Sequence, residues 1–259
     1  MPPFVYTRTV MSEPNSSVVA WVAGATGYTG RSVVARLCAQ GARVHAHVRP
    51  DSPGFERWRT TFESQGAVVE PVVWEPGAIR AALERCAPTQ VYALLGTTMA
   101  KARASVRAGQ PPADYERVDV GMSLMVLAAA RALPRPPRFV YLSAAGAGPG
   151  ARGDYMRARA RVEAEVLASG VPYTIARPSF ITGSDREGRP LERAGAAVVD
   201  TTLHVLAALG AKRLAARWGS MTGETLAAAL VDAAGDPAAA NCVLEADALR
   251  ERGSSAPRG

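Results

Sequence analysis

Lysine is nearly absent from this chain: only Lys101 and Lys212 occur in 259 residues, and arginine carries almost all of the positive charge. The formal net charge is nevertheless +7, and the pI is about 9.8. The arginines are scattered, and no block rich in basic residues with interleaved aromatic residues occurs. We therefore read the basic balance as biased composition and expect no binding of nucleic acid.

Cysteine and histidine are also scarce. Cys38, Cys86 and Cys242 share no motif spacing, and the three histidines are not clustered with them. We expect reduced, buried thiols and no metal site. His45 and His47 alternate with apolar residues, which favours sheet positions in a two-sided core over a role as ligands.

Long apolar runs are missing as well. No run reaches the roughly 18 residues that a membrane span needs. The N-terminus has no continuous apolar segment of the kind found in a secretory signal. We expect a cytoplasmic protein without a membrane span, a monomer or homodimer that acts on a small-molecule substrate.

A glycine-rich segment is the most informative stretch that is present. Residues 18–31 read V-V-A-W-V-A-G-A-T-G-Y-T-G-R, an apolar run, three glycines and the start of a helical pattern. Strand, tight turn and helix in this order are typical of the first unit of a dinucleotide-binding fold. Gly24 permits the turn, Gly27 lets the backbone approach a pyrophosphate, and Gly30 lets the helix pack on the strand. The helix N-terminus offers N–H groups and a positive dipole end to the phosphates.

Strand-like and helix-like segments alternate after this turn. We predict strands at 18–23, 43–48, 67–73, 90–95, 138–142, 173–176 and 242–244, and helices from the glycine turn to about 41 and at 77–86, 115–132 and 155–169. Helical patterning also occurs at 191–214 and 222–234. This alternation predicts an α/β fold, a Rossmann-type doubly wound parallel sheet with a small C-terminal substrate-capping region.

The chain length fits one such domain. We expect residues 1–17 to form a flexible tail and residues 18–252 to form a single NAD(P)-binding Rossmann domain. The substrate-pocket elements are expected mainly in 179–252, and residues 253–259 are expected to be a second flexible tail.

Arg49 follows the second predicted strand, 19 residues beyond Gly30. An acidic residue there would bind the adenosine ribose hydroxyls, whereas an arginine pairs with the 2′-phosphate of NADP. Arg31 is a second cation, and Pro50 is expected to turn the chain before Asp51. The sequence favours NADP(H), with NAD(H) as the alternative.

Residues after the later strands complete the expected cofactor crevice, because the carboxyl ends of parallel strands meet at one edge. The expected cofactor-binding residues are Gly24, Thr26, Gly27, Tyr28, Thr29, Gly30, Arg31, Arg49, Leu95, Gly96, Thr97, Tyr155, Arg159, Pro178 and Phe180. For Lys101 the sequence leaves open a surface position or a place in the active site.

Ser143, Tyr155 and Arg159 are the candidate catalytic residues. Tyr155 and Arg159 are four residues apart, so they share one helix face. A tyrosine can donate the proton that a reduced carbonyl needs, a neighbouring cation stabilises the tyrosinate, and a serine hydroxyl can polarise the carbonyl oxygen. Each residue also has an ordinary explanation: a loop serine, a half-buried aromatic ring and an arginine on a solvated face.

These residues lie within a longer pattern that resembles the atypical short-chain dehydrogenase/reductases. The likeness is greatest to the Tat-interacting-protein oxidoreductase group, with NmrA-like proteins as wider relatives. It runs from about residue 18 to about 184. The matching segments are G-A-T-G-Y-T-G at 24–30, V-R at 48–49, L-G-T-T at 95–98 with Lys101 following, R-V-D at 117–119, Y-L-S-A-A-G-A at 141–147, Y-M-R-A-R-A-R-V-E-A-E-V from Tyr155, and A-R-P-S-F at 176–180.

The resemblance implies a Rossmann fold, NADP(H) and a Ser–Tyr–Lys active site, in which Ser143 and Tyr155 match. The third position departs, because Arg159 stands where the family has lysine, and a planar guanidinium is not equivalent to an ammonium. We predict an NADP(H)-dependent reductase of a carbonyl or quinone-like molecule. The alternative is an NADP(H)-sensing regulatory protein with little or no catalysis, since some of these relatives bind the cofactor without acting as enzymes.

Overall fold

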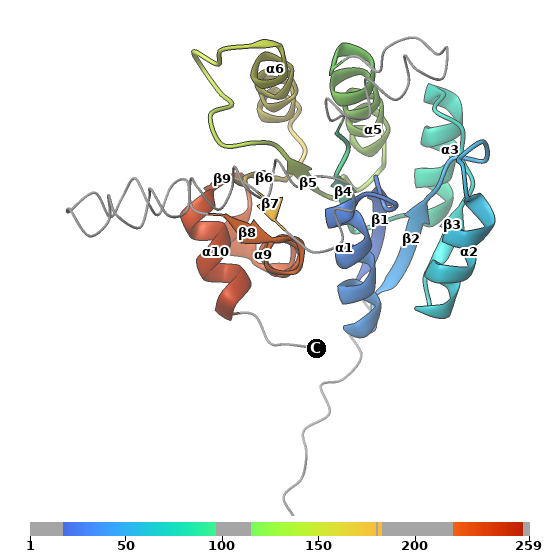
Figure 1. The fold of residues 1–259 in the computed structure, drawn as a ribbon. Helices are drawn as coiled ribbons and strands as arrows, with labels where there is room; N and C mark the ends of the chain where they lie inside the picture. Colours follow the sequence, from blue (N-terminus) through green and yellow to red (C-terminus); the bar gives the residue numbers. More distant parts are fainter. Residues whose placement is uncertain (1–17, 97–114, 180, 183–219, 256–259) are drawn as a thin grey trace, which may run out of the picture.

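A parallel sheet of seven strands forms the centre of the protein in the computed structural model, which describes residues 18–96, 115–179, 181–182 and 220–255 (Figure 1). The strand order is β3-β2-β1-β4-β5-β6-β9. These strands are β1 (Val19–Ala23), β2 (Arg43–His47), β3 (Val68–Glu70), β4 (Gln90–Ala93), β5 (Arg138–Leu142), β6 (Tyr173–Arg177) and β9 (Cys242–Glu245). The order reverses at β1, as in the doubly wound fold that the sequence predicts.

Helices cover both faces of this sheet (Figure 1). One face carries α1 (Tyr28–Ala39), α2 (Phe55–Ser64), α9 (Gly223–Gly235) and α10 (Ala246–Ser255). The other carries α3 (Pro76–Cys86), α5 (Met122–Arg131) and α6 (Asp154–Ala168), with the π-helical turn η1 (Tyr115–Gly121) leading into α5. Two short elements, β7 (Ile181–Thr182) and β8 (Met221–Thr222), pair in a separate parallel sheet. The 3-10 turn η2 (Pro237–Ala239) precedes β9.

The alternation of side chains along the strands explains why both faces are covered. On β1, Val22 packs against the α1 side, whereas Trp21 packs against the α3 side. All four residues Ala20 to Ala23 are fully buried. Strands buried on both faces read as continuous apolar runs rather than as alternating ones, which is the pattern seen at 18–23.

Helix α2 is one of the elements that the sequence reading missed, and helix α10 is another. The ten residues of α2 carry only one fully buried side chain, Phe62, so their apolar periodicity is weak. Trp58 stacks on Phe62, with ring centroids 5.8 Å apart, and these two aromatic rings hold the helix against the sheet. A polar segment with two anchoring aromatic rings resembles a loop when only its composition is considered.

The described elements at 220–255 belong to the core and do not cap the sheet edge as expected, whereas residues 183–219 of the expected substrate-pocket region lie outside the described residues. Strand β9 is the seventh strand of the sheet and pairs in parallel with β6. Helix α9 buries most of its alanine-rich length against α1 and α10. The expected tail from residue 253 is also wrong at its start, since α10 continues through Ser255. A Cβ on Gly253 would lie 2.2 Å from the Thr225 carbonyl oxygen, so this residue is closely packed.

The histidines of β2 lie in the core, as predicted, but one of them meets a cysteine. His47 bonds through Nε2 to the Val72 carbonyl oxygen at 2.8 Å, and burial lowers its pKa to about 4. His45 Nδ1 lies 3.3 Å from Cys86 Sγ and 2.9 Å from Glu70 Oε1. The separation of histidines and cysteines in the sequence therefore does not hold in space, because the fold joins residues 41 positions apart. All three thiols are free, but only Cys86 is buried.

Candidate functional site

The glycine turn has the geometry that its sequence predicts. Gly24 has φ +79°, and a Cβ there would lie 2.6 Å from the Leu94 carbonyl oxygen. A Cβ on Gly30 would lie 2.1 Å from the Gly24 carbonyl oxygen, so the first turn of α1 packs directly against the end of β1. No other residue type fits at these two positions without moving backbone atoms.

The N-terminus of α1 is open to an anion. Gly27 caps the helix without a side chain, and the first turn contains no acidic residue. The Arg31 N–H donates to the Gly27 carbonyl oxygen at 3.0 Å, whereas the N–H groups ahead of it belong to the part of a helix that has no intrahelical acceptor. Thr26, Gly27 and Tyr28 are half-buried, and Thr29 is buried. This end of α1 can therefore hold a pyrophosphate.

The turn lies at the point where the sheet order reverses. Strand β1 pairs with β2 on one side and with β4 on the other. The Leu94 N–H donates to the Ala23 carbonyl oxygen at 3.0 Å, which places Leu95 and Gly96 beside the glycine turn. Open α/β sheets bind their ligands at such a switch point. Thr97 and Lys101, which were also predicted for this edge, lie outside the described residues.

Arg49 lies beyond the carboxyl end of β2, on the opposite side of the turn from β4. Its side chain is 44% exposed, and its guanidinium lies 3.5 Å from a carboxylate oxygen of Asp51. The Ser52 N–H bonds to the Arg49 carbonyl oxygen, so this turn brings Asp51 back toward Arg49. The chain turns at Pro50, as expected, but the turn leaves the two charges close to each other.

Trp58 joins this region to α1, and the sequence reading did not identify it. The Arg31 guanidinium carbon lies 5.7 Å from the centre of the Trp58 ring, and that of Arg57 lies 5.4 Å away. Cation–π contacts of this kind hold an arginine in place at a modest gain in free energy. The missed helix α2 therefore supplies the surface on which Arg31 rests.

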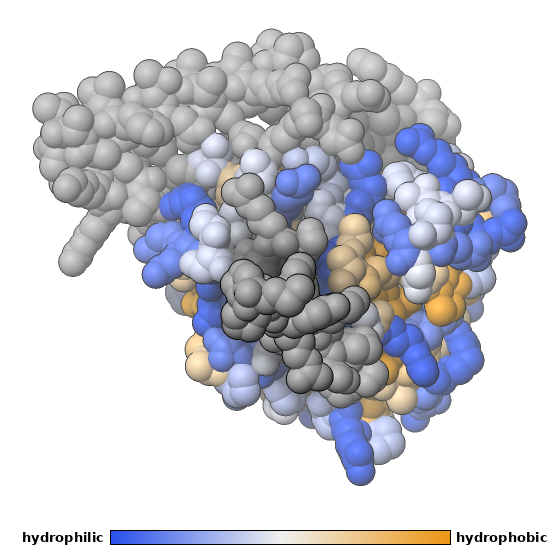
Figure 2. Space-filling model, turned by 90° about the horizontal axis from the view of Figure 1, so that it is seen from below, coloured by the Kyte–Doolittle hydropathy of each residue, from blue (hydrophilic) through white to orange (hydrophobic). Residues whose placement is uncertain are grey.

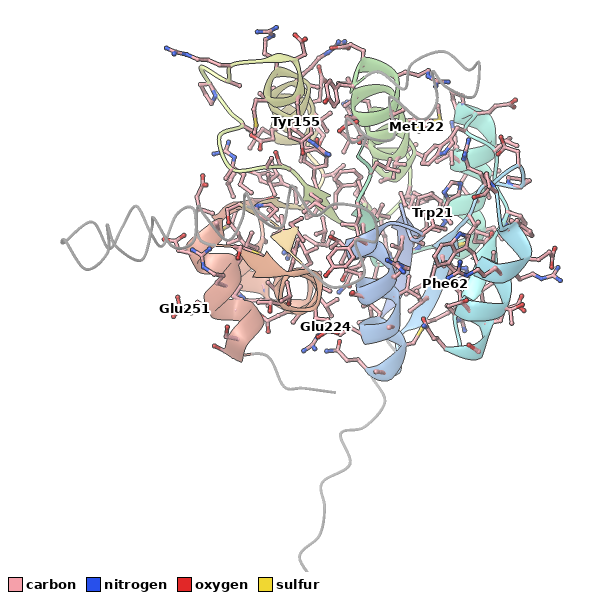
Figure 3. The ribbon with its side chains drawn as sticks, viewed as in Figure 1. Trp21, Phe62, Met122, Tyr155, Glu224 and Glu251 are labelled. Carbon is pink, nitrogen blue, oxygen red and sulfur yellow. The ribbon has the colours of Figure 1, made fainter. Side chains whose placement is uncertain are left out.

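Tyr155 and Arg159 lie together on the first two turns of α6, near the carboxyl ends of β4 and β5. Figure 3 shows Tyr155 on α6, on the same side of the sheet as Met122 of α5. The guanidinium carbon of Arg159 lies 5.2 Å from the centre of the Tyr155 ring, and the Tyr115 ring is 5.3 Å away. Tyr155 is half-buried, and its hydroxyl has no hydrogen-bond partner within the described part of the chain.

Arg159 is buried and has several partners, so the reading of a solvated face is wrong. Its Nη1 donates to the carbonyl oxygens of Leu95 at 3.0 Å and Leu142 at 2.8 Å. Its Nη2 forms an ion pair with Asp119 at 2.9 Å, with side-chain exposures of 4% and 0%. Nη2 also fills the space that a Cβ on Gly96 would need, at 2.5 Å. Arg159 thus joins the ends of β4 and β5 to η1.

Arg159 stays protonated in this environment. Burial by itself lowers the pKa of Arg159. The interactions with Tyr141, Tyr155 and Asp119 raise this pKa by a larger amount, so that the net shift is upward. The Tyr141 hydroxyl accepts a hydrogen bond from Arg159 at 3.3 Å. Burial raises the pKa of Tyr141 to about 12. The site therefore holds a permanent buried cation beside the Tyr155 ring.

Ser143 forms its hydrogen bond with Glu163 rather than with Tyr155 or Arg159. Its hydroxyl donates to Glu163 Oε1 at 2.5 Å, and Glu163 also accepts from Arg177 Nη2 at 2.6 Å. Arg177 in turn bonds to Glu245 of β9 at 2.9 Å. Glu163 lies eight residues after Tyr155, about 12 Å along the axis of α6. The structure thus brings Tyr155 and Arg159 together, but it joins Ser143 to Glu163.

The remaining predicted residues lie after β6. Pro178 is buried, and its carbonyl oxygen accepts from the Ala145 N–H at 2.8 Å, which joins the loops after β5 and β6. Phe180 lies outside the described residues.

Asp119 and Glu163 are the two site residues that sequence reasoning did not assign. Each is an acid on the apolar face of a helix, a pattern that signals a buried ion pair. Asp119 precedes buried Ser123 and Leu127 by four and eight residues. Glu163 continues the spacing of Tyr155 and Arg159 and follows Val162, which is buried. A buried carboxylate needs a partner, and the arginines supply it here.

A model of the NAD(P)H-binding family matches residues 24–237 of this sequence. The chain belongs to that family. The match begins at the first glycine of the turn and continues into the turn that precedes β9, so it includes all the site residues described above. No curated protein matched the chain.

Solved structures share the fold of this NAD(P)H-binding domain. A protein assigned as an NAD-dependent epimerase/dehydratase from Bacillus halodurans is 16% identical, with a TM-score of 0.61 over 91% of this chain and 99% of that one. A protein assigned as an epimerase from Burkholderia cenocepacia J2315 is 23% identical, with a TM-score of 0.57 over 86% and 74%. A structure of the pinoresinol-lariciresinol and phenylcoumaran benzylic ether reductases is 15% identical, with a TM-score of 0.51 over 64% and 51%. At such identities the likeness concerns the fold alone.

No helix within the described residues has the length and apolar content needed to cross a membrane. On the face shown in Figure 2, hydrophilic residues interrupt the apolar areas wherever the surface is not drawn in grey.

Proposed function

We propose that this NAD(P)H-binding domain is an NADP(H)-dependent oxidoreductase that reduces a carbonyl or quinone-like small molecule. The sequence resemblance to atypical short-chain dehydrogenase/reductases and the fold shared with benzylic ether reductases support a reductase. Arg49 and Arg31 support NADP(H), because both cations lie on the β2 side of the glycine turn, where this fold holds the adenosine ribose.

The residues present fit the cofactor. Gly27 at the start of α1 has no side chain in the way of a pyrophosphate, and no acid in the first turn repels it. Gly96 leaves the surface between β1 and the Arg159 guanidinium without a side chain. NADPH, when bound, supplies the hydride for the reaction.

One observation carries the catalytic proposal: the Tyr155 hydroxyl is unpartnered within the described residues, and its ring lies 5.2 Å from a buried guanidinium. As the substrate carbonyl carbon accepts a hydride, its oxygen gains negative charge and takes the proton from the Tyr155 hydroxyl. The O–H bond of Tyr155 breaks, and solvent later returns the proton. Arg159 stabilises the tyrosinate that forms in between.

The neighbouring Tyr115 is the weaker candidate for this proton. Burial, followed by the charges of Asp119, Tyr155 and Asp154, raises the pKa of Tyr115. Loss of its proton is therefore opposed on every count. No cation lies over its ring among the contacts of the described residues, whereas Arg159 lies over that of Tyr155.

The test begins with a panel of ketones, enones and quinones, with oxidation of NADPH as the signal. Once a substrate is found, Tyr155→Phe should abolish turnover and leave the affinity for NADPH nearly unchanged. Tyr173→Phe is the matched control, because Tyr173 begins β6 at the amino edge of the sheet. If Tyr155→Phe turns over like the parent protein, Tyr155 is not the donor. Tyr115→Phe and Lys101→Ala are then the variants to measure.

A second candidate function has one observation in its favour. The Ser143 hydroxyl proton and the Arg159 guanidinium are both engaged by buried acids, Glu163 and Asp119. A domain that binds NADP(H) and reports its redox state to another protein needs no free catalytic groups. If NADPH binds tightly but no panel member is reduced, a pull-down with and without the cofactor tests this regulatory role.

A further inference from the structure

A cluster of three potential metal ligands lies away from the cofactor crevice. His45 comes from the middle of β2, Glu70 ends β3, and Cys86 ends α3. One ligand atom from each lies within 4.8 Å of the other two. All three residues are at least nine-tenths buried, with exposures of 9%, 6% and 8%. We propose that this cluster binds a divalent transition metal ion of the Zn²⁺ type.

The distances between the donor atoms fit such an ion. His45 Nδ1 and Glu70 Oε1 are 2.9 Å apart, Cys86 Sγ and His45 Nδ1 are 3.3 Å apart, and Cys86 Sγ and Glu70 Oε1 are 3.5 Å apart. Tetrahedral Zn²⁺ with ordinary bond lengths separates such donors by roughly 3.3–3.6 Å. The three atoms therefore form one face of a tetrahedron after shifts of a few tenths of an ångström. A water molecule completes a four-coordinate site.

The chemistry of the donors selects the kind of ion. Thiolate and imidazole are ligands for Zn²⁺ and Co²⁺ rather than for Mg²⁺ or Ca²⁺, which prefer oxygen. Binding replaces the proton of the Cys86 thiol with the metal and releases that proton to solvent. The thiolate and the Glu70 carboxylate then balance the two positive charges of the ion.

The second oxygen of Glu70 already has a partner outside the triad. The Arg85 guanidinium lies 2.5 Å from Glu70 Oε2, whereas His45 and Cys86 contact Oε1. Outer contacts of this kind orient a carboxylate ligand toward a metal. An ion here would join the three-residue edge strand β3 to its neighbour β2 and to the end of α3. We infer a site that stabilises the sheet edge and takes no part in hydride transfer.

The experiment uses the full chain, treated with a chelator and kept reduced with a phosphine, and titrated with Co²⁺. We expect one equivalent to bind, with a thiolate-to-Co²⁺ charge-transfer band, to be displaced by Zn²⁺, and to raise the melting temperature. Cys86→Ser should lose the band and the rise in melting temperature. Glu70→Gln should keep the band, because the thiolate remains, but bind at least about 10-fold more weakly.

Cys38→Ser and Cys242→Ser are matched controls, because these two thiols lie outside the cluster. Both should bind Co²⁺ like the parent protein. Far-ultraviolet circular dichroism of the metal-free variants establishes that Cys86→Ser is folded. Absence of saturable binding by the parent, or a charge-transfer band that persists in Cys86→Ser, would overturn the proposal. NADPH binding is measured on the same samples, so that failure of the metal site is distinguishable from failure of the proposed reductase.

Discussion

At the carboxyl edge of the sheet, backbone geometry dominates on the β1–β2 side, whereas buried charge dominates on the β4–β6 side. Around β1, the surface consists of Gly24, Gly27 and Gly30 and the open end of α1, and the nearest charges are half-buried Arg31 and exposed Arg49. Around β4 to β6, the charges of Arg159, Asp119 and Glu163 are buried and paired.

This difference has an energetic consequence. A backbone cradle is complete as soon as the turn folds, and it leaves its N–H groups available to a phosphate. Buried charges must satisfy one another before any ligand arrives, because an unpaired charge in the interior is costly. Hence changes on the first side should alter binding of the cofactor, and changes on the second side should alter stability first.

The largest effect should come from Asp119→Asn. The substitution leaves the Arg159 charge buried without its carboxylate, and breaking a buried pair costs about 3–5 kcal/mol. Chemical denaturation should show a loss of that size. The exposed pair of Arg161 and Glu116 is the control, since Glu116→Gln should change stability by no more than about 1 kcal/mol. Equal losses for the two variants would contradict the role given to burial.

Gly27→Val should act on binding instead of stability. A Cβ on Gly27 would lie 3.1 Å from the Gly24 carbonyl oxygen, a contact that small shifts relieve. The branched side chain then occupies the path of the pyrophosphate, and we expect the NADPH affinity to fall about 100-fold or more, or about 2.7 kcal/mol. Calorimetry measures it, with Gly77→Val in the open first turn of α3 as the control. A folded variant with parental affinity would remove the glycine turn from the binding site.

Arg49→Asp should separate the two cofactors. It replaces a partner of the 2′-phosphate with a repelling charge, and a charge-assisted hydrogen bond is worth roughly 1.5–3 kcal/mol. NADPH binding should weaken by about that much and NADH binding much less. Arg43→Asp is the control on the same strand, about 20 Å away at its amino end, and should change neither affinity. Equal losses for NADPH and NADH would exclude Arg49 from the phosphate site.

Arg159→Lys tests whether the guanidinium acts through its charge or through its shape. Lysine is the residue that the short-chain dehydrogenase/reductases have at this position, and it keeps a cation near Tyr155. Turnover should therefore be retained or increased. It cannot reproduce the planar set of bonds to Leu95, Leu142 and Asp119, and stability should fall by about 1 kcal/mol for a lost hydrogen bond. Arg159→Ala should lose both stability and activity. A variant with lysine that is stable but inactive would show that shape matters for catalysis.

The smallest effect should come from Asp51→Asn. The pair between Asp51 and Arg49 is exposed, and such pairs contribute about 0.2–1 kcal/mol. Removing the acid leaves Arg49 available to the 2′-phosphate. NADPH should therefore bind up to several-fold more tightly, whereas the affinity for NADH should not change. The gain should vanish at high salt. A weaker affinity for NADPH would mean that Asp51 helps to position Arg49.

The sequence by itself determined the fold class and the β1–α1 turn, because these depend on local rules. Apolar periodicity sets strands and helices, and the positions of Gly24 and Gly30 follow from backbone sterics within seven residues of chain. The helical spacing of Tyr155 and Arg159 likewise placed both side chains on one face.

Only the tertiary structure decided which charged groups meet. Arg159 pairs with Asp119, 40 positions earlier, Ser143 bonds to Glu163, and His45 meets Cys86 across 41 positions. The same holds for β9, whose place beside β6 depends on a pairing across the whole C-terminal segment. These pairings form because burying a charge or a strand edge without a partner is unfavourable in free energy. That cost depends on what lies nearby in space, and local sequence does not record it.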